Sequence, residues 1–370
     1  MKERKNAAVA QDGFALIVTL LIISILVVLI LEFNRAVRGD LIMAGNFRDE
    51  TKAYYLAKSG VNAAIALLQA DDNQYDALTE EWALEKPPVP LGEGIVFVKI
   101  TDESGKINLN SLVVDLARRG QGQTGSGQQS SGPQTTATGS PYPGANAAAR
   151  SSQQSQQGQQ GQQGKQGAGL QDDQPDPFQY QLLKRLFDAL EIDVEAVDAL
   201  VDWIDKNNDI YEGRGAEDGV KNGVLNTIAE LRMVKGFTDE TLTKLGVGRI
   251  AGMIDMESNR YLTVHSYPDG KININTANQL ALQSLHDDLS SDIADRIIET
   301  RKEDPFETVD ALRQVIGDQK IFDAIKGYVT VKSDYYSVES YGVVNDIRKR
   351  IVALLKKDQG TIKVVYWKVE

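Results

Sequence analysis

The sequence predicts an α+β protein in which a long N-terminal α-helix packs on an antiparallel sheet and a large all-α domain is inserted between strands. Three observations support this fold class. An apolar run near the start continues into a helical pattern that meets no proline before Pro87. One strand-like segment at residues 94–100 and three more after residue 334 flank a block of short helical patterns. Strands separated by a run of helices are typical of α+β folds.

The first predicted element is an apolar helix. Residues 14–31 contain no charged side chain, and as a helix they span about 27 Å, close to the thickness of a bilayer core. The segment before them carries Lys2, Arg4 and Lys5, which favours keeping that end in the cytoplasm. The sequence therefore predicts a single-pass membrane helix with a cytoplasmic N-terminus.

The junction between Gly13 and Phe14 stands directly before this apolar run. A secretory signal peptide has its cleavage site after the apolar core, whereas cleavage here would leave the helix on the product. The junction resembles the type IV prepilin signal. That resemblance implies that a prepilin peptidase cuts after Gly13 and that Phe14 becomes the N-methylated first residue. The alternative is a membrane anchor that is not cleaved.

Beyond the membrane the helical pattern continues as far as Gln69, with apolar residues such as Tyr54, Val61 and Leu68 on one side. A helix from Phe14 to Gln69 is on the order of 80 Å long, which predicts a stalk whose far end packs on a globular head. The chain is then expected to divide into a leader at 1–13, a membrane and stalk helix at 14–70, a head at 71–118 and 331–370, a linker at 119–176 and an inserted helical domain at 177–330.

Composition supports this division. The linker is dominated by Gln, Gly and Ser, so it cannot bury enough apolar surface to offset the entropy of ordering, and we expect it to be disordered. In the helical domain Thr238 and Ser290 are expected to begin helices and Pro305 to end one. After it, residues 335–343, 346–355 and 361–367 alternate as strands do, and with residues 94–100 they predict one antiparallel sheet.

Charge and composition exclude several kinds of function. The formal net charge is −12, and an acidic protein repels phosphate backbones. The absence of Cys excludes disulfides, thiolate metal sites and a Cys nucleophile. His265 and His286 are far apart and give little support for a zinc site or a Ser-His-Asp triad. With no phosphate loop and no nucleophile motif either, we expect the protein not to be an enzyme.

An acidic loop is the candidate metal site. Asp205, Asn207 and Asp209 place side-chain oxygens at alternate positions, and Glu217 and Asp218 follow shortly after. Alternating oxygens closed by a distal carboxylate are how a calcium loop gathers its ligands. The pattern is not an EF-hand. When Asp205 is counted as the first position, the sixth is Ile210, where an EF-hand has a glycine. A solvated acidic loop without metal is the alternative.

Taken together, the motifs resemble one family, the minor pseudopilin K of type II secretion, also called general secretion pathway protein K. The resemblance rests on the Gly13–Phe14 junction with its helix, on TDESGKINLN at 101–110, on LVDWID at 200–205 with GAED at 215–218, on NINTA at 273–277, and on the tail ending in Tyr366 and Trp367. It covers nearly the whole chain except the linker.

This resemblance implies a pilin-like head with an inserted helical domain and a structural Ca²⁺ in that domain. It also implies a position in the inner membrane with the head in the periplasm. The implied partners are the minor pseudopilins I and J and the major pseudopilin, in a filament that exports folded proteins across the outer membrane.

Val18 is the position that the resemblance makes informative, because it is the fifth residue counted from Phe14. Ordinary pilins carry a Glu there, whose carboxylate offsets the terminal amine of a neighbouring subunit in the apolar filament core, where an unpaired charge costs several kcal/mol. A subunit without this carboxylate suits the tip of the filament. The alternative is that Val18 is simply another apolar residue of a membrane span.

A rival function is a membrane-anchored DNA receptor of the competence type. Residues 273–277 followed by small helices also resemble its helix-hairpin-helix domain. However, the corresponding hairpin at 285–289 has no glycine and contains two carboxylates, and residues 176–330 hold 29 Asp and Glu against 17 Lys and Arg. Phosphate binding needs backbone N–H groups and basic side chains, so we expect no nucleic-acid binding.

Overall fold

The computed structural model describes residues 3–115, 173–207, 209–211, 219–247, 249–250, 253–254, 261–358 and 360–370. It divides into two compact units, one formed by Met1–Ile107 with Lys271–Glu370 and the other by Asn108–Gly270. The first unit contains the long helix and the main sheet, and the second is largely helical. The mixed α+β class expected from the sequence is confirmed.

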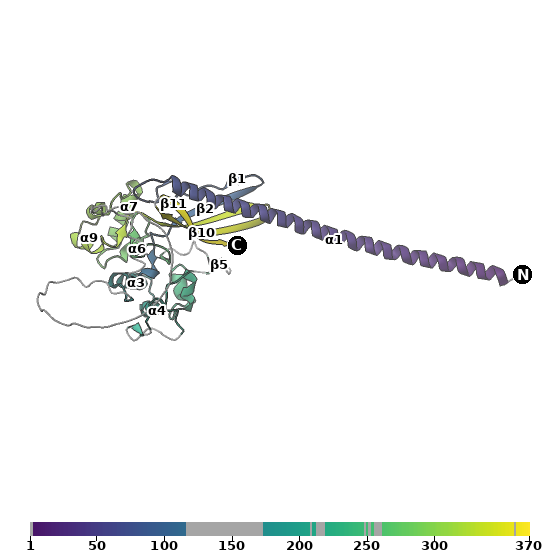
Figure 1. Cartoon of the computed structure of the whole chain (residues 1–370), viewed down its shortest axis with the longest axis horizontal. Coiled ribbons are helices and arrows are strands. Elements are labelled where there is room, and N and C mark those ends of the chain that lie inside the picture. Colours follow the sequence, from purple (N-terminus) through teal and green to yellow (C-terminus); the bar gives the residue numbers. More distant parts are fainter. Residues whose placement is uncertain are drawn as a thin grey trace, which may run out of the picture. The chain divides into compact units, whose positions relative to one another are not determined.

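The first unit begins with α1 (Glu3–Ala70), a single helix that extends well beyond the sheet on which its C-terminal part packs (Figure 1). The helix includes the segment expected as a leader and continues through the expected stalk. No proline interrupts it, and Gly39, Gly45 and Gly60 are accommodated within it.

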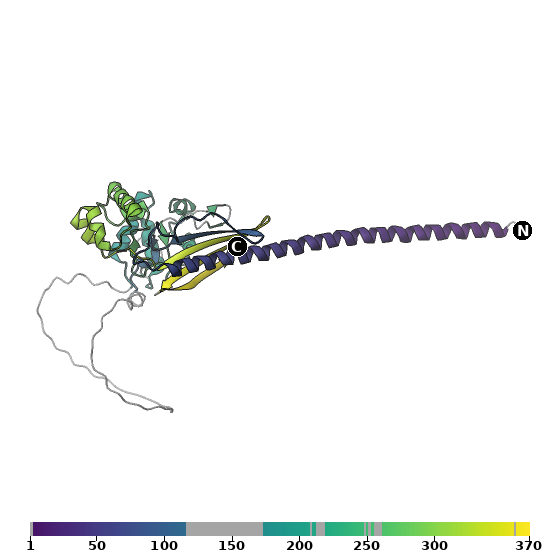
Figure 2. The same cartoon turned by 90° about the horizontal axis from the view of Figure 1, so that it is seen from above.

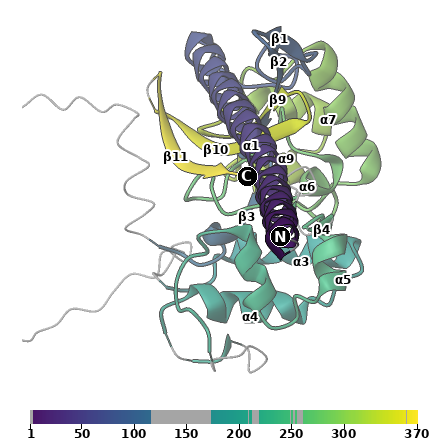
Figure 3. The same cartoon turned by 90° about the vertical axis from the view of Figure 1, so that its right-hand side faces the viewer.

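The sheet has five strands, β1 (Val89–Leu91), β2 (Gly94–Asp102), β9 (Tyr335–Val344), β10 (Ile347–Asp358) and β11 (Thr361–Val369). Their order is β1-β2-β9-β10-β11, and each neighbouring pair is antiparallel. Seen along α1, the strands fan out behind the helix (Figure 3). The three C-terminal strands and the strand at 94–100 therefore form the predicted sheet, and β1 adds a short fifth strand that we did not predict.

The core of this unit lies between α1 and the sheet, whose strands run beside the end of the helix in Figure 2. Ala57, Val61 and Leu68 on α1 are fully buried together with Ile351 and Leu355 on β10. Small residues allow the helix to come close to the strands. A Cβ on Gly342 of β9 would overlap the carbonyl oxygen of Ala53, so this glycine is needed for the close approach.

A small helical module belongs to the same unit. It contains β7 (Ile272–Asn273), α6 (Gln279–Gln283), α7 (Ser291–Glu303), η5 (Val309–Ala311), α8 (Leu312–Ile316), α9 (Gln319–Ile325) and β8 (Val329–Thr330). Strands β7 and β8 pair in parallel and bring the two ends of the module together. The Asn273 N–H also donates to the Ser104 carbonyl at 2.8 Å, which ties the module to the end of β2.

The second unit begins in β3 (Ile107–Asn108) and η1 (Leu109–Ser111). It continues with α3 (Pro177–Ala189), α4 (Glu195–Ile204), η3 (Ile228–Met233), α5 (Asp239–Lys244), β4 (Arg249–Ile250), β5 (Met253–Ile254) and β6 (Leu262–Thr263). The division at Gly270 falls inside the range that we expected as one inserted domain, residues 177–330. The expected linker at 119–176 lies outside the described residues as far as residue 172.

Candidate functional site

The membrane segment is the apolar first part of α1. From Phe14 to Ala70 the helix is long and apolar enough to cross a membrane, and the apolar window is not buried by any other part of the described chain. The uncharged run at residues 14–31 has two side-chain hydroxyl groups, and both bond to the helix backbone: Thr19 Oγ1 donates to the Leu16 carbonyl at 2.9 Å and Ser24 Oγ to the Leu21 carbonyl at 2.8 Å. The segment therefore offers lipid no unsatisfied side-chain donor, as a membrane environment requires.

Gly13, Phe14 and Val18 all lie inside α1. Phe14 and Val18 are one helical turn apart, so they share a face of the helix, and both side chains are exposed. Gly13 lies in a part of the helix for which only the backbone is described. Val18 thus lies in a part of α1 that has no carboxylate at any position from Phe14 to Leu31.

The candidate metal loop follows α4. Asp205, the first predicted ligand, is the C-terminal cap of this helix and is 3% exposed. Its Oδ2 accepts from Asn207 Nδ2 at 3.0 Å, and Asn207 Oδ1 accepts from the Asp209 N–H at 2.8 Å. These three residues are thus brought together in one compact turn. The predicted ligands Glu217 and Asp218 lie outside the described residues.

Two further carboxylates that the sequence analysis did not single out are buried beside this loop. Asp198 and Asp202 precede Asp205 by seven and three positions, so the three side chains follow one face of α4. Asp198 and Asp202 are 1% and 0% exposed. The only signal in the sequence is this spacing, which is also typical of an ordinary solvated helix face.

Two tyrosines cover this acidic face. The Tyr180 hydroxyl donates to Asp198 Oδ1 at 2.5 Å, and the Tyr211 N–H donates to Asp202 Oδ1 at 2.8 Å. The two rings meet edge to face, with centroids 5.6 Å apart. Asp198 Oδ2 is buried and has no hydrogen-bond partner among the described residues. Buried carboxylates are normally paired or bound to a metal, so this donor set of hard oxygens fits Ca²⁺.

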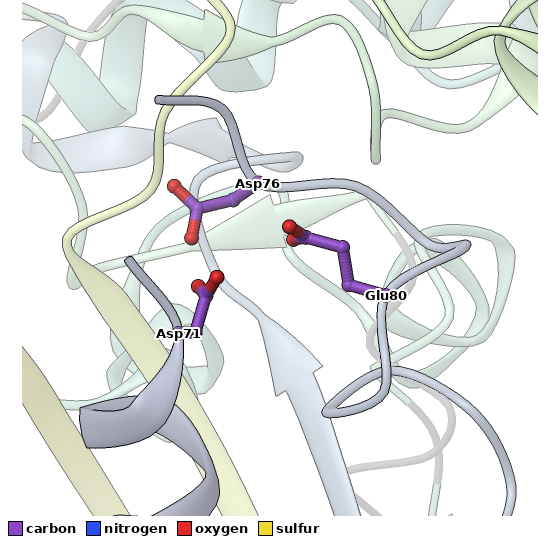
Figure 4. A group of neighbouring side chains, drawn as sticks. All are labelled: Asp71, Asp76 and Glu80. Atoms are coloured by element: carbon purple, nitrogen blue, oxygen red, sulfur yellow. The ribbon is translucent and has the colours of Figure 1, made fainter. Parts of the chain in front are cut away.

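Another acidic group lies in the first unit. The carboxylates of Asp71, Asp76 and Glu80 point toward one another (Figure 4). One oxygen of each lies within 4.8 Å of one oxygen of the other two. Lys357 Nζ lies 2.8 Å from Asp71 and 3.6 Å from Asp76. Glu80 accepts from Trp82 Nε1 at 2.8 Å. Because a lysine and other protein donors occupy the group, it ties the end of α1 to β10.

Comparison with known proteins decides the family. Two sequence models described as type II secretion system, protein K, match residues 105–246 and 272–332, which together are more than half of the chain. The chain belongs to the protein K family of the type II secretion system. The matched ranges contain the candidate metal loop and the helical module.

Similar proteins agree with the protein K assignment over nearly the whole length. A protein from Aeromonas hydrophila named type II secretion system protein K is 23% identical over 363 residues, covering 92% of this chain and 91% of the relative. A similar fold occurs in the crystal structure of the GspK-GspI-GspJ complex from the type 2 secretion system of enterotoxigenic Escherichia coli. That match has a TM-score of 0.62 at 17% identity and covers 89% of this chain and 99% of the other.

The rival DNA-binding function would depend on the hairpin at residues 285–289. Between α6 and α7, Leu285 and Leu289 are buried, so the hairpin packs on its own module. His286 Nδ1 accepts from the Asp288 N–H at 3.1 Å, while the Asp288 side chain is exposed. An exposed carboxylate beside the hairpin repels a phosphate.

Proposed function

We propose that this chain caps the tip of the type II secretion pseudopilus and helps to start its assembly, as a minor pseudopilin in the export of folded proteins across the outer membrane. The observation that carries the proposal is Val18, which stands one helical turn after Phe14 in an uncharged part of α1. The role is mechanical rather than catalytic.

The argument depends on one buried charge. Cleavage after Gly13 gives Phe14 a terminal ammonium inside an apolar bundle of helices, and an unpaired charge there costs several kcal/mol. A subunit with a carboxylate at its fifth residue offsets the ammonium of its neighbour. Val18 has no carboxylate, so this chain does not compensate a neighbour stacked above it. It is therefore suited to the last position of the filament.

The same proposal assigns a location and partners. The helix stands in the inner membrane with its N-terminus in the cytoplasm, since Lys2, Arg4 and Lys5 precede the apolar run, and the head lies in the periplasm. We infer that the partners are the minor pseudopilins I and J and the major pseudopilin, with the prepilin peptidase acting on the precursor. The support for I and J is the fold shared with a chain solved in complex with GspI and GspJ.

We further propose that the second unit holds a structural Ca²⁺ beside α4. Asp205, Asn207 and Asp209 are the predicted ligands that the structure brings together, and Glu217 and Asp218 remain predicted ligands. Asp198 and Asp202 add buried negative charge at the same face of α4. A divalent cation would offset the cost of burying these carboxylates, and in a chain without disulfides it would clamp the loop to the helix.

The experiment that tests the tip position uses cells that overproduce the major pseudopilin and assemble long filaments. Antibodies against the Asn108–Gly270 unit, carrying gold particles, locate this chain by electron microscopy. We expect label at one end of wild-type filaments. In the Val18→Glu variant the subunit gains the missing carboxylate, so label along the filament is expected, whereas the matched Val18→Ile variant should keep label at the end.

Two outcomes would contradict the proposal. Label distributed along wild-type filaments would exclude a tip position. Label that stays at one end in the Val18→Glu variant would show that the residue at position 18 does not decide where the subunit is placed.

A further inference from the structure

The last strand of the sheet has a free edge. β11 pairs with β10 from Thr361 opposite Asp358 to Val369 opposite Ile351, and it ends the strand order, so its other edge has no strand partner among the described residues. Such an edge presents a row of unpaired backbone N–H and C=O groups. It is the feature on which another extended chain can form a further strand.

The two edges of the sheet differ in how they are protected. β1 at the opposite edge has three residues and contains Pro90, and short strands with proline resist strand addition. β11 has nine residues and neither proline nor glycine. In the described chain after Met233, the large apolar side chains that are exposed all lie in β11, namely Val364, Val365, Tyr366 and Val369, at 42–51% exposure.

The pairing with β10 assigns a face to each side chain. Val364, Trp367 and Val369 stand opposite Leu355, Ala353 and Ile351, which are fully buried under α1. These three β11 residues therefore point to the α1 side of the sheet, and Ile362 joins them. The bulge at Val365 inserts one extra residue and shifts the alternation of β11 by one position. Lys363, Tyr366 and Lys368 therefore point to the other side.

We propose that the free edge of β11 binds an extended segment of a partner protein as an added strand, and that this segment carries apolar residues on the α1 side and acidic residues on the other side. The charge of the edge supports the acidic partner. β11 itself carries Lys363 and Lys368 and no acidic residue, although the whole chain has a net charge of −12. Lys363 is available, because its bond to Asp358 is an exposed ion pair, which contributes little. The Lys368 side chain is 52% exposed, although its partner Glu370 is half-buried.

A second copy of this chain is a poorer occupant. Two β11 strands paired antiparallel about the bond between Val365 and Tyr366 would place each Lys363 opposite the Lys368 of the other copy. Like charges directly opposite each other on one face destabilise a strand pair. The proposed surface requires only the folded head, so it does not depend on the tip position or on Val18.

The test uses the full-length protein in detergent and three labelled ten-residue peptides. The first alternates Val and Glu, the second alternates Val and Lys, and the third repeats the first with its alternate amides N-methylated. Fluorescence anisotropy measures binding. We expect the Glu peptide to bind about tenfold more tightly than the Lys peptide, because opposite charges across a strand pair replace like charges. The N-methylated peptide should bind at least about tenfold more weakly than the first, because it cannot pair its backbone.

Matched variants separate an edge effect from net charge. Reversing Lys363→Glu and Lys368→Glu should make the protein prefer the Lys peptide. The same charge change at two exposed lysines of the helical module, Lys302→Glu and Lys326→Glu, should leave the preference for the Glu peptide unchanged. The proposal is overturned if no peptide binds, if N-methylation has no effect, or if the two double variants shift the preference equally.

Discussion

Ser333 and Asp102 are joined by a buried hydrogen bond, in which the serine hydroxyl donates to Asp102 Oδ2 at 2.6 Å. Asn273 Nδ2 also donates to this oxygen at 3.3 Å, and the Thr276 hydroxyl donates to it as well. Asp102 ends β2, whereas Asn273 and Thr276 belong to the helical module. One carboxylate therefore holds together three segments of the first unit that are far apart in the sequence.

This carboxylate predicts a pH dependence. Burial raises the pKa of Asp102 to about 6, although hydrogen bonds from Ser333, Thr276 and the Ser104 N–H oppose the shift. Between pH 4 and pH 6 the native state then binds more protons at this site than the unfolded state. The free energy of unfolding should fall as the pH rises through this window and level off above it, by roughly 3 kcal/mol from this group.

The measurement is urea unfolding of the full-length protein between pH 4 and pH 7. The Asp102→Asn variant should have a flatter profile than wild type, because the amide does not titrate. Asp310→Asn, at an exposed side chain, is the matched control and should follow wild type. Parallel profiles for wild type and Asp102→Asn would show that Asp102 does not titrate in this range.

Processing of the N-terminus predicts a definite mass. The mature protein extracted from membranes should begin at Phe14 and carry one added methyl group. A Gly13→Leu variant should keep the leader, because a large residue replaces the glycine at the expected cleavage site. Intact mass spectrometry distinguishes the two products, and a full-length wild-type mass would rule out the pilin-like signal.

Calcium should stabilise the second unit. A ligand that binds only the native state, present at a free concentration of about a hundred times its dissociation constant, adds about 2.7 kcal/mol to the free energy of unfolding. Chelator-treated protein should therefore have its unfolding midpoint at a lower urea concentration than protein in excess Ca²⁺. The Asp205→Asn variant should fold in chelator but lose this gain, because it removes a buried carboxylate of the site.

The control for the calcium prediction is Asp188→Asn, at an exposed position on α3. It should keep the full gain. Calorimetry with Ca²⁺ alone gives an independent reading, and the absence of binding heat in chelator-treated wild type, together with unchanged unfolding, would leave the acidic loop as a solvated turn.

The packing of α1 on β9 also predicts a large effect of one methyl group. Gly342→Ala places a Cβ against the Ala53 carbonyl, and because backbone cannot turn aside as a side chain can, the cost should be about 1–3 kcal/mol or more. Gly327→Ala adds a methyl group where no atom lies within 4 Å and should change stability little. Urea unfolding followed by Trp fluorescence checks both, and equal midpoints would contradict the close packing.

Much of the first unit was accessible from sequence. The absence of proline before Pro87 predicted α1, and the alternation in 335–343 and 361–367 predicted strands that the structure contains. These signals are local, since each depends on residues a few positions apart. The contacts that assign a segment to a unit join residues far apart in the sequence. The local patterns therefore predicted one domain at 177–330 and did not predict the division at Gly270.

Two polar residues show why the rest was not predictable. Asn108 caps η1, and Asn110 lies inside this short helix. Asn110 is buried and bonds through Nδ2 to the carbonyls of Leu225 and Val264, both at 2.9 Å. Asp198 resembles a solvated acid in the sequence, yet Tyr180 covers it. In both cases the hydrogen-bond partner is distant along the chain, so the local spacing of apolar and polar residues does not predict it.

The order of the strands has a consequence for biogenesis. β2 is made early, but its neighbour in the sheet is β9, paired from Ile95 opposite Val343 to Asp102 opposite Tyr336, after all of the second unit has been synthesised. Pairing between such distant segments is slow to form, because a long loop must close first. The C-terminal part of α1 therefore keeps an exposed apolar face until β9 and β10 have been synthesised, and a chain truncated before β9 has only β1 and β2 of the sheet.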